Sequence, residues 1–200
     1  MPTKIRLSCH IEKKRSNLSR KGGWGFKSRC YLCPLKTKKI MSKQEIILCQ
    51  GLENNLKQVV DKCPHDKLFI LTDAHTHRLC LPELQGMHVL QEAEEISIGA
   101  EDIHKNIETL AQVWQALSER GATRHSLLIN LGGGMVTDLG GFAAATFKRG
   151  ITYINIPTTL LAMVDASVGG KTGINFNGLK NEIGVFAPAG CVLVETAFLR

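Results

Sequence analysis

From residue 41 onward, short apolar runs alternate with stretches of helical periodicity. Alternation of this kind is typical of β-α units, in which helices connect the strands of a parallel sheet. The apolar runs predict strands at Ile46–Cys49, Leu68–Leu71, Met87–Leu90, Leu127–Leu131, Tyr153–Ile156 and Val192–Val194. Apolar residues recur every three or four positions in Ile103–Leu117, and a second helix should start near Val136 and run through Phe147. We therefore expect an α/β fold, a mostly parallel sheet with helices on both faces.

Residues 1–40 differ from the rest of the chain in charge and in pattern. They hold 12 Lys and Arg against the single acid Glu12, a net charge of +11, which leaves 25 − 12 = 13 bases and 18 − 1 = 17 acids for residues 41–200. Crowded like charges without apolar periodicity predict a disordered extension, with Met41 as the true start. The alternative is a basic, acid-poor targeting segment. Cys30 and Cys33 could form half of a zinc site, although one CxxC pair is weak evidence.

Composition excludes several classes of protein. No run of about 18 apolar residues is present, so we expect no membrane span. Seven scattered cysteines do not resemble the framework of a secreted disulfide-rich domain, which favours a reducing cytoplasm. The net charge of −4 over residues 41–200 gives no electrostatic reason to bind nucleic acid.

A glycine triplet connects a predicted strand to a predicted helix. Gly132, Gly133 and Gly134 follow Leu127–Leu131, and the helical pattern begins directly afterwards. A helix N-terminus with glycines before it presents backbone N–H groups to a phosphate. The spacing matches neither GxGxxG nor the P-loop, so on its own the triplet could equally be a tight packing turn.

Polar residues gather in the segment that follows. Thr158 and Thr159 come directly after a strand, where ligands bind in open α/β sheets. The Gly-rich stretch beyond them, which we expect to form loops or a hairpin, carries further polar residues, namely Asp165, Lys171, Asn175, Lys180 and Asn181. Each lysine alone would suit a solvated surface, but together with Arg149 the set favours a site for an anionic, polyhydroxylated ligand.

These segments together resemble the 3-dehydroquinate synthase family of sugar-phosphate cyclases. The resemblance rests on GGGMVTD (132–138), GF (141–142), RG (149–150), PTTLL (157–161), VDASVGGKTGIN (164–175) and KNxIGxF (180–186). It implies a Rossmann-like NAD-binding domain over residues 41–200, incomplete at its C-terminal end, without the all-helical C-terminal domain of the family. The iron-type alcohol and glycerol dehydrogenases share only the GGG and PTT elements and resemble the chain less.

The resemblance also implies a reaction. Members use NAD to oxidise the C5 alcohol of 3-deoxy-D-arabino-heptulosonate 7-phosphate (DAHP), eliminate phosphate, reduce the ketone again and close the ring to 3-dehydroquinate. Residue by residue, it places NAD contacts on Asp73, Asp102, Lys105, Gly134, Met135, Val136, Thr137, Asp138, Thr158, Thr159, Lys171, Lys180, Phe198 and Leu199. The substrate-side residues are Asp165, Lys171 and Asn181, and Arg149 is expected to reach the substrate phosphate of a neighbouring subunit in a homodimer. The chain departs from the family pattern at His75, normally Asn, and at Asp102, normally Glu.

The family's zinc or cobalt is held by one Glu and two His, and the resemblance places all three beyond residue 200. No metal ligand is therefore expected among residues 1–200, and this chain alone should be inactive. Two alternatives stay open: another sugar-phosphate cyclase, such as a 2-deoxy-scyllo-inosose or valiolone-type synthase, and a non-functional truncated gene product.

Overall fold

The computed structural model describes residues 44–200. Within this range one parallel sheet has the strand order β1-β8-β5-β4-β2-β3. Its strands are β1 (Glu45–Leu48), β2 (Leu68–Asp73), β3 (Glu94–Ile98), β4 (Leu127–Gly132), β5 (Thr152–Pro157) and β8 (Cys191–Val194). The chain runs outward from β2 to β3 on one side and from β4 through β5 to β8 on the other. The direction therefore reverses between β2 and β4, and an open α/β sheet binds ligands at the carboxyl ends beside such a reversal.

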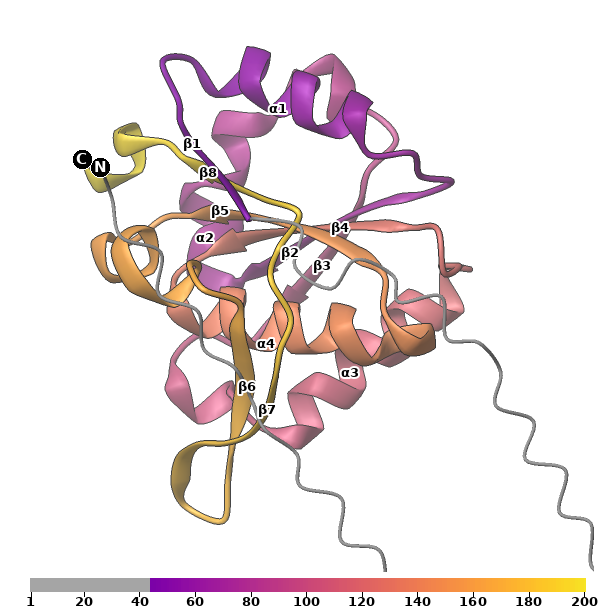
Figure 1. Ribbon diagram of the computed structural model, residues 1–200, viewed down its shortest axis with the longest axis vertical. Coiled ribbons are helices and arrows are strands. Elements are labelled where there is room, and N and C mark those ends of the chain that lie inside the picture. Colours follow the sequence, from indigo (N-terminus) through magenta and orange to yellow (C-terminus); the bar gives the residue numbers. More distant parts are fainter. Residues whose placement is uncertain (1–43) are drawn as a thin grey trace, which may run out of the picture. The chain divides into compact units, whose positions relative to one another are not determined.

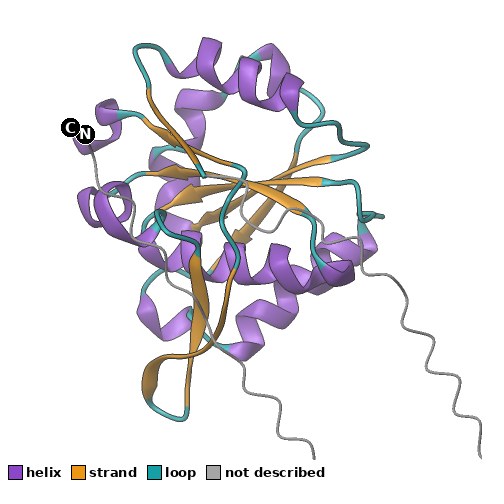
Figure 2. Cartoon of the chain, in the orientation of Figure 1, coloured by secondary structure: helices purple, strands orange, loops and turns teal. Residues whose placement is uncertain are grey.

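Helices cover both faces of the sheet, as the sequence predicts (Figures 1 and 2). The helices are α1 (Leu52–Lys62), α2 (Ala74–Leu79), α3 (Ile107–Glu119) and α4 (Gly134–Thr146). Figure 1 shows α1 on one face and α3 and α4 on the other. No helix within residues 44–200 is long and apolar enough to cross a membrane.

The central strands are buried on both faces, which explains their continuous apolar runs. Along β2, Leu68 and Ile70 pack in the cluster that contains the apolar residues of α1. Phe69 and Leu71 point the other way, into the cluster under α3 and α4. Successive side chains of a strand alternate between faces, so one apolar strand contributes to two cores. The two clusters, one on each face, hold the strands in place and so fix the position of their carboxyl ends.

The Gly-rich segment after residue 169 forms an antiparallel hairpin of β6 (Lys171–Phe176) and β7 (Leu179–Phe186). The sequence predicted either loops or a hairpin here, and the hairpin is what the structure has. Its turn is Asn177-Gly178, both with positive φ (49° and 77°), the chemistry of a two-residue hairpin loop. Strand β6 packs on α4 so closely that a Cβ on Gly141 would lie 2.6 Å from the Thr172 methyl group. The hairpin is thereby held beside the N-terminal half of α4.

Two sequence predictions need correction. The strand predicted at Met87–Leu90 is wrong, because His88–Leu90 forms a short 3-10 helix. The strand that follows β2 in the chain is instead β3, at the edge of the sheet. Only Ile96 and Ile98 of β3 are buried, and its acidic residues lie toward the surface. The helix predicted from Ile103 starts four residues later, because the side chain of Asn106 accepts a hydrogen bond from the Thr109 N–H and caps α3 there.

Candidate functional site

The N-terminus of α4 presents unpaired backbone donors. The first hydrogen bond of this helix runs from Thr137 N–H to Gly133 C=O (3.0 Å), and Gly133 supplies no side-chain cap. Within residues 44–200, the N–H groups of Gly134, Met135 and Val136 have no acceptor. Three free donors at the positive end of a 13-residue helix suit an anion.

Gly133 and Gly134, at the start of α4, are needed because other chain segments lie close to their Cα atoms. A Cβ on Gly133 would lie 3.2 Å from the Thr159 methyl group, and one on Gly134 would lie 3.3 Å from the Ala166 Cβ. Either position therefore leaves little room for a side chain. A ligand phosphate can approach the backbone here only because these residues are glycine.

A cavity of about 690 Å³ opens beside this helix end, between α4 and the β6–β7 hairpin. Nine residues that the family resemblance implicates line it, namely Asp102, Lys105, Gly134, Met135, Asp138, Asp165, Lys171, Lys180 and Asn181. They come from four separate parts of the chain. The structure therefore brings together seven of the fourteen predicted NAD contacts and all three predicted substrate-side residues; their roles remain predictions.

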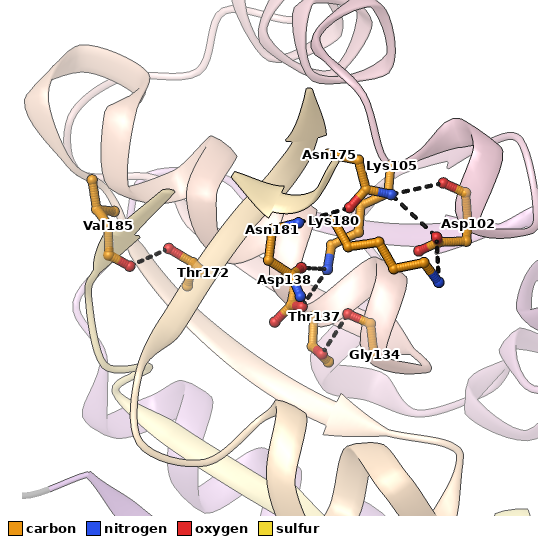
Figure 3. A network of polar contacts seen from close by, with 10 residues as sticks. All are labelled: Asp102, Lys105, Gly134, Thr137, Asp138, Thr172, Asn175, Lys180, Asn181 and Val185. Atoms are coloured by element: carbon orange, nitrogen blue, oxygen red, sulfur yellow. Dashed lines mark hydrogen bonds and ion pairs between the residues drawn. The ribbon is translucent and has the colours of Figure 1, made fainter. Parts of the chain in front are cut away.

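A buried ion pair lies in the wall of this cavity (Figure 3). Lys105 Nζ lies 2.6 Å from Asp138 Oδ2, and the two side chains are 6% and 18% exposed. The same ammonium donates a hydrogen bond to the Asn181 side-chain oxygen. Burial raises the pKa of Asp138, and the hydrogen bond and charge of Lys105 oppose that rise. Lys105 thus favours the ionised form of Asp138, against the effect of burial.

A second ion pair closes the outer side of the network. Lys180 Nζ lies 3.1 Å from Asp102 Oδ2, and these side chains are 77% and 49% exposed. The hydrogen bond from Lys180 holds the pKa of Asp102 below its ordinary value, despite some desolvation. Two residues expected to contact NAD therefore contact each other here, and a ligand would have to fit around that pair or replace it.

A second cavity, of about 950 Å³, opens at the carboxyl ends of the sheet strands. Thr158, Thr159 and Phe198 line it, together with His75 and Cys80. Thr159 also lies against Gly133, the residue before α4, so the second cavity adjoins the helix N-terminus that lines the first cavity. Burial raises the pKa of the Cys80 thiol.

Asp73 performs a structural task at the end of β2. Its Oδ1 accepts hydrogen bonds from the N–H groups of His75 and Thr76, both at 2.8 Å, and so caps α2. The other oxygen, Oδ2, has no hydrogen bond within residues 44–200. One carboxylate oxygen therefore remains for the ribose hydroxyl that the family resemblance assigns to Asp73.

Some predicted residues lie away from the cavities. The side chains of Val136 and Thr137 are buried in the core (0% and 1% exposed), so only their backbone can reach a ligand. Leu199 is exposed and does not line the second cavity, although its neighbours Phe198 and Arg200 do. Arg149 lies beyond the opposite end of α4, in an open 380 Å³ depression with Arg124 and Lys148.

Lys171 and Asp165 both line the first cavity, but no ion pair joins them in the described part of the chain. Sequence reasoning also grouped Asn175 with the ligand-contacting residues. It does not line the cavity, and its side chain instead binds Asp102 and the Asn181 N–H. The possible zinc ligands Cys30 and Cys33 lie outside the described residues.

Comparison with known proteins identifies the relatives of this architecture. The family model described as 3-dehydroquinate synthase N-terminal matches residues 95–200. The chain is 54% identical over 160 residues to a 3-dehydroquinate synthase of Parabacteroides distasonis, covering 80% of the chain and 45% of the relative. It is 47% identical over 131 residues to one of Thermococcus kodakarensis, covering 66% of the chain and 37% of that relative. The chain thus spans less than half the length of these curated relatives.

Solved structures give the same picture of the fold. A 2-epi-5-epi-valiolone synthase of Streptomyces hygroscopicus subsp. jinggangensis, with NAD+ and Zn2+ bound, superposes with a TM-score of 0.70 at 31% identity, over 80% of this chain and 44% of that one. A 2-deoxy-scyllo-inosose synthase in complex with carbaglucose-6-phosphate, NAD+ and Co2+ also has a TM-score of 0.70, at 21% identity, over 76% of this chain and 43% of that one. At that identity the second likeness supports the fold alone.

Proposed function

The chain belongs to the 3-dehydroquinate synthase family, and on that premise we propose that it is the dinucleotide-binding part of an enzyme that converts DAHP to 3-dehydroquinate and phosphate. Identity of 54% to a 3-dehydroquinate synthase, against 31% to a valiolone synthase, favours this substrate over those of the other cyclases. The proposal covers NAD as cofactor and a small sugar phosphate as substrate.

One observation carries the proposal: free N–H groups at the start of α4 adjoin one cavity directly and a second through the contact of Gly133 with Thr159, and residues that the family resemblance implicates line both. A dinucleotide has its two phosphates in the middle and a nucleoside at each end. We place the pyrophosphate on the N–H groups of Gly134 to Val136. The adenosine half takes the cavity with Thr158, Thr159 and Phe198, and the nicotinamide half takes the cavity with Asp138 and Lys180.

The residues of the first cavity then divide the remaining work. When bound, NAD+ would reversibly accept a hydride from a substrate alcohol, which becomes a ketone. Lys171 is exposed on the cavity wall and offers a compact cation with three donors, which suits the substrate's phosphate or hydroxyl oxygens. Asp165 and Asn181 supply acceptors for hydroxyl groups, and the amide of Asn181 also supplies donors. Lys105 pairs with Asp138 in the wall of this cavity and favours its ionised form.

Arg149 cannot serve the same cavity. A helix of 13 residues is about 20 Å long, and Arg149 follows its C-terminal end whereas Gly134 begins it. Its exposed position is consistent with a role toward the substrate phosphate of a second subunit, so we propose a homodimer for the complete enzyme. No three His, Cys, Asp or Glu side chains cluster within residues 44–200, so the described residues do not fit a metal site.

Calorimetric titration of the chain with NAD+ tests the proposal. Binding should be detectable and should weaken at least tenfold in Gly134→Val, because the new side chain would occupy the space above the free N–H groups. Gly190→Val is the matched control, since a Cβ there meets its nearest neighbour at 3.5 Å and lies outside both cavities. Equal affinity of the wild type and Gly134→Val would move the nucleotide site elsewhere.

A further inference from the structure

The inner end of the hairpin departs from regular strand geometry at Asn181. Asn181 has φ +54°, in the left-handed region that residues other than glycine seldom adopt. Ile174 pairs with Ile183 and Phe176 with Leu179, so Asn175 alone on β6 faces three residues of β7. This is a bulge, and bulges commonly re-aim side chains beside functional sites.

The bulge changes the direction of two neighbouring side chains. In a regular strand Lys180 and Asn181 would point to opposite faces. Here Lys180 pairs with Asp102 and Asn181 accepts from Lys105, so both are directed to the same Asp102–Lys105 segment (Figure 3). Both also line the first cavity. The cavity therefore has its present shape only because the backbone at Asn181 is left-handed.

Asn175 makes the contacts that hold this backbone. Its Oδ1 accepts a hydrogen bond from the Asn181 N–H at 3.0 Å, and its Nδ2 donates to Asp102 Oδ2 at 3.1 Å and to the Asp102 C=O at 3.3 Å. Its own N–H donates to the Lys105 C=O at 2.8 Å. Asn175 thus ties both strands of the hairpin to the segment that carries Asp102 and Lys105.

We propose that Asn175 is a positioning residue, which holds Asn181 in the left-handed conformation and so directs Lys180 and Asn181 into the ligand cavity. The consequence for ligand binding rests on the proposed function, whereas the consequence for the backbone does not. Asn175 itself does not line the cavity, so any effect of its replacement on binding must act through its neighbours.

Amide hydrogen exchange measured by NMR tests the backbone part without any ligand. Asn175→Ala should speed exchange of the Asn181 N–H about tenfold while amides of β4 keep their protection. Asn175→Asp retains an accepting oxygen for the Asn181 N–H but sets a second carboxylate against Asp102, so it is combined with Asp102→Asn, whose amide can donate. This double variant should keep the Asn181 N–H protected, which also decides the question if Asn175→Ala does not fold. Asn177→Ala is the control, because Asn177 is in the same hairpin with φ +49° and has no side-chain hydrogen bond in the described part of the chain. Unchanged exchange in Asn175→Ala, or lost protection in Asn175→Asp/Asp102→Asn, would overturn the proposal.

Calorimetry with NAD+ tests the consequence for binding. Asn175→Ala should raise the dissociation constant about tenfold, and Asn177→Ala should change it less than twofold. In a Lys180→Ala background the effect of Asn175→Ala should shrink, because Asn175 acts through the residues that it places. If the effects of Asn175→Ala and Lys180→Ala on the binding free energy are fully additive, Asn175 does not act through Lys180. If the wild type does not bind NAD+, the proposed function fails, and the exchange experiment still decides the role of Asn175.

Discussion

Lys105 Nζ and Asp138 Oδ2 lie 2.6 Å apart, with the Lys105 side chain 6% exposed and the Asp138 side chain 18% exposed. This pair connects the segment before α3 to the first turns of α4, and Asn181 of the hairpin binds the same ammonium. The segment before α3, helix α4 and the hairpin are thus joined by the Lys105 ammonium. A buried pair adds little net stability when intact, but removing one partner leaves an uncompensated charge in the interior.

We therefore expect Lys105→Met to lower the free energy of unfolding by about 3 kcal/mol at pH 8. Burial already raises the pKa of Asp138, and losing Lys105 removes the main opposing effect, so the pKa rises further. A carboxyl group whose pKa is raised by folding contributes stability at low pH that is lost as the pH rises through the folded-state value. The defect should accordingly be smaller at pH 5 than at pH 8.

Urea unfolding at both pH values measures this effect. Lys105→Met/Asp138→Asn should recover most of the loss at pH 8, because no buried charge is left without a partner. Lys180→Met removes the exposed pair with Asp102 and should cost less than about 1 kcal/mol at either pH. A loss in Lys105→Met that does not depend on pH would contradict the role assigned to Asp138.

Lys171 should matter for ligands and not for folding. It is exposed on the wall of the first cavity and makes no ion pair in the described part of the chain. Lys171→Met should change the free energy of unfolding by less than about 0.5 kcal/mol. Binding of a sugar phosphate in the presence of NAD+, measured by calorimetry, should weaken by about tenfold or more, the scale of one charged hydrogen bond. Unchanged binding would remove Lys171 from the substrate site.

Two adjacent glycines should differ in their tolerance of a methyl group. Both have left-handed backbones, Gly169 with φ +86° and Gly170 with φ +72°. A Cβ on Gly169 would meet nothing within 4 Å, whereas one on Gly170 would lie 2.7 Å from the backbone of Pro188. Gly169→Ala should cost about 1 kcal/mol from conformation alone. Gly170→Ala should cost about 3 kcal/mol or more, because the backbone at Pro188, between β7 and β8, must also move. Equal losses in denaturant unfolding would show that the Pro188 contact is relieved at no cost.

Deletion of residues 1–40 should leave the stability of the remainder unchanged, because their +11 charge and lack of pattern predict no packed core. A longer deletion that also removes residues 41–44 should be different. Gln44 donates to the Ser167 C=O at 3.0 Å and accepts from the Gly169 N–H at 2.9 Å. Thermal unfolding of the two deletion variants compares them, and a large loss in the shorter deletion would refute the predicted domain boundary.

Much of the fold could be predicted because the buried strands carry unbroken apolar runs, as β4 does in Leu127–Leu131. Strand β3 escaped prediction because an edge strand needs only one buried face, and Glu94 and Glu95 obscure the alternation of Ile96 and Ile98. The apolar Met87–Leu90 run was more conspicuous, although it only covers the core as a 3-10 turn.

The site was predictable where residues lie at strand ends and unpredictable where they depend on one another. The position of Gly134 and Thr158 follows from the strands before them. The left-handed backbone of Asn181 does not, because Asn tolerates this conformation without requiring it. The Lys105–Asp138 pair was equally hidden, since residues 33 positions apart become neighbours only when the segment before α3 packs against α4.

We propose above that NAD+ lies across the N-terminus of α4. The most direct test is the change in amide NMR shifts when NAD+ is added to the 15N-labelled chain. The amides of Gly134, Met135 and Val136 should shift most, with smaller shifts at Thr158 and Asp138, which line the two cavities. The same titration of Gly134→Val should leave these amides largely unmoved at equal NAD+ concentration. Saturable shifts confined to other parts of the chain, with Gly134 to Val136 unaffected, would contradict the account.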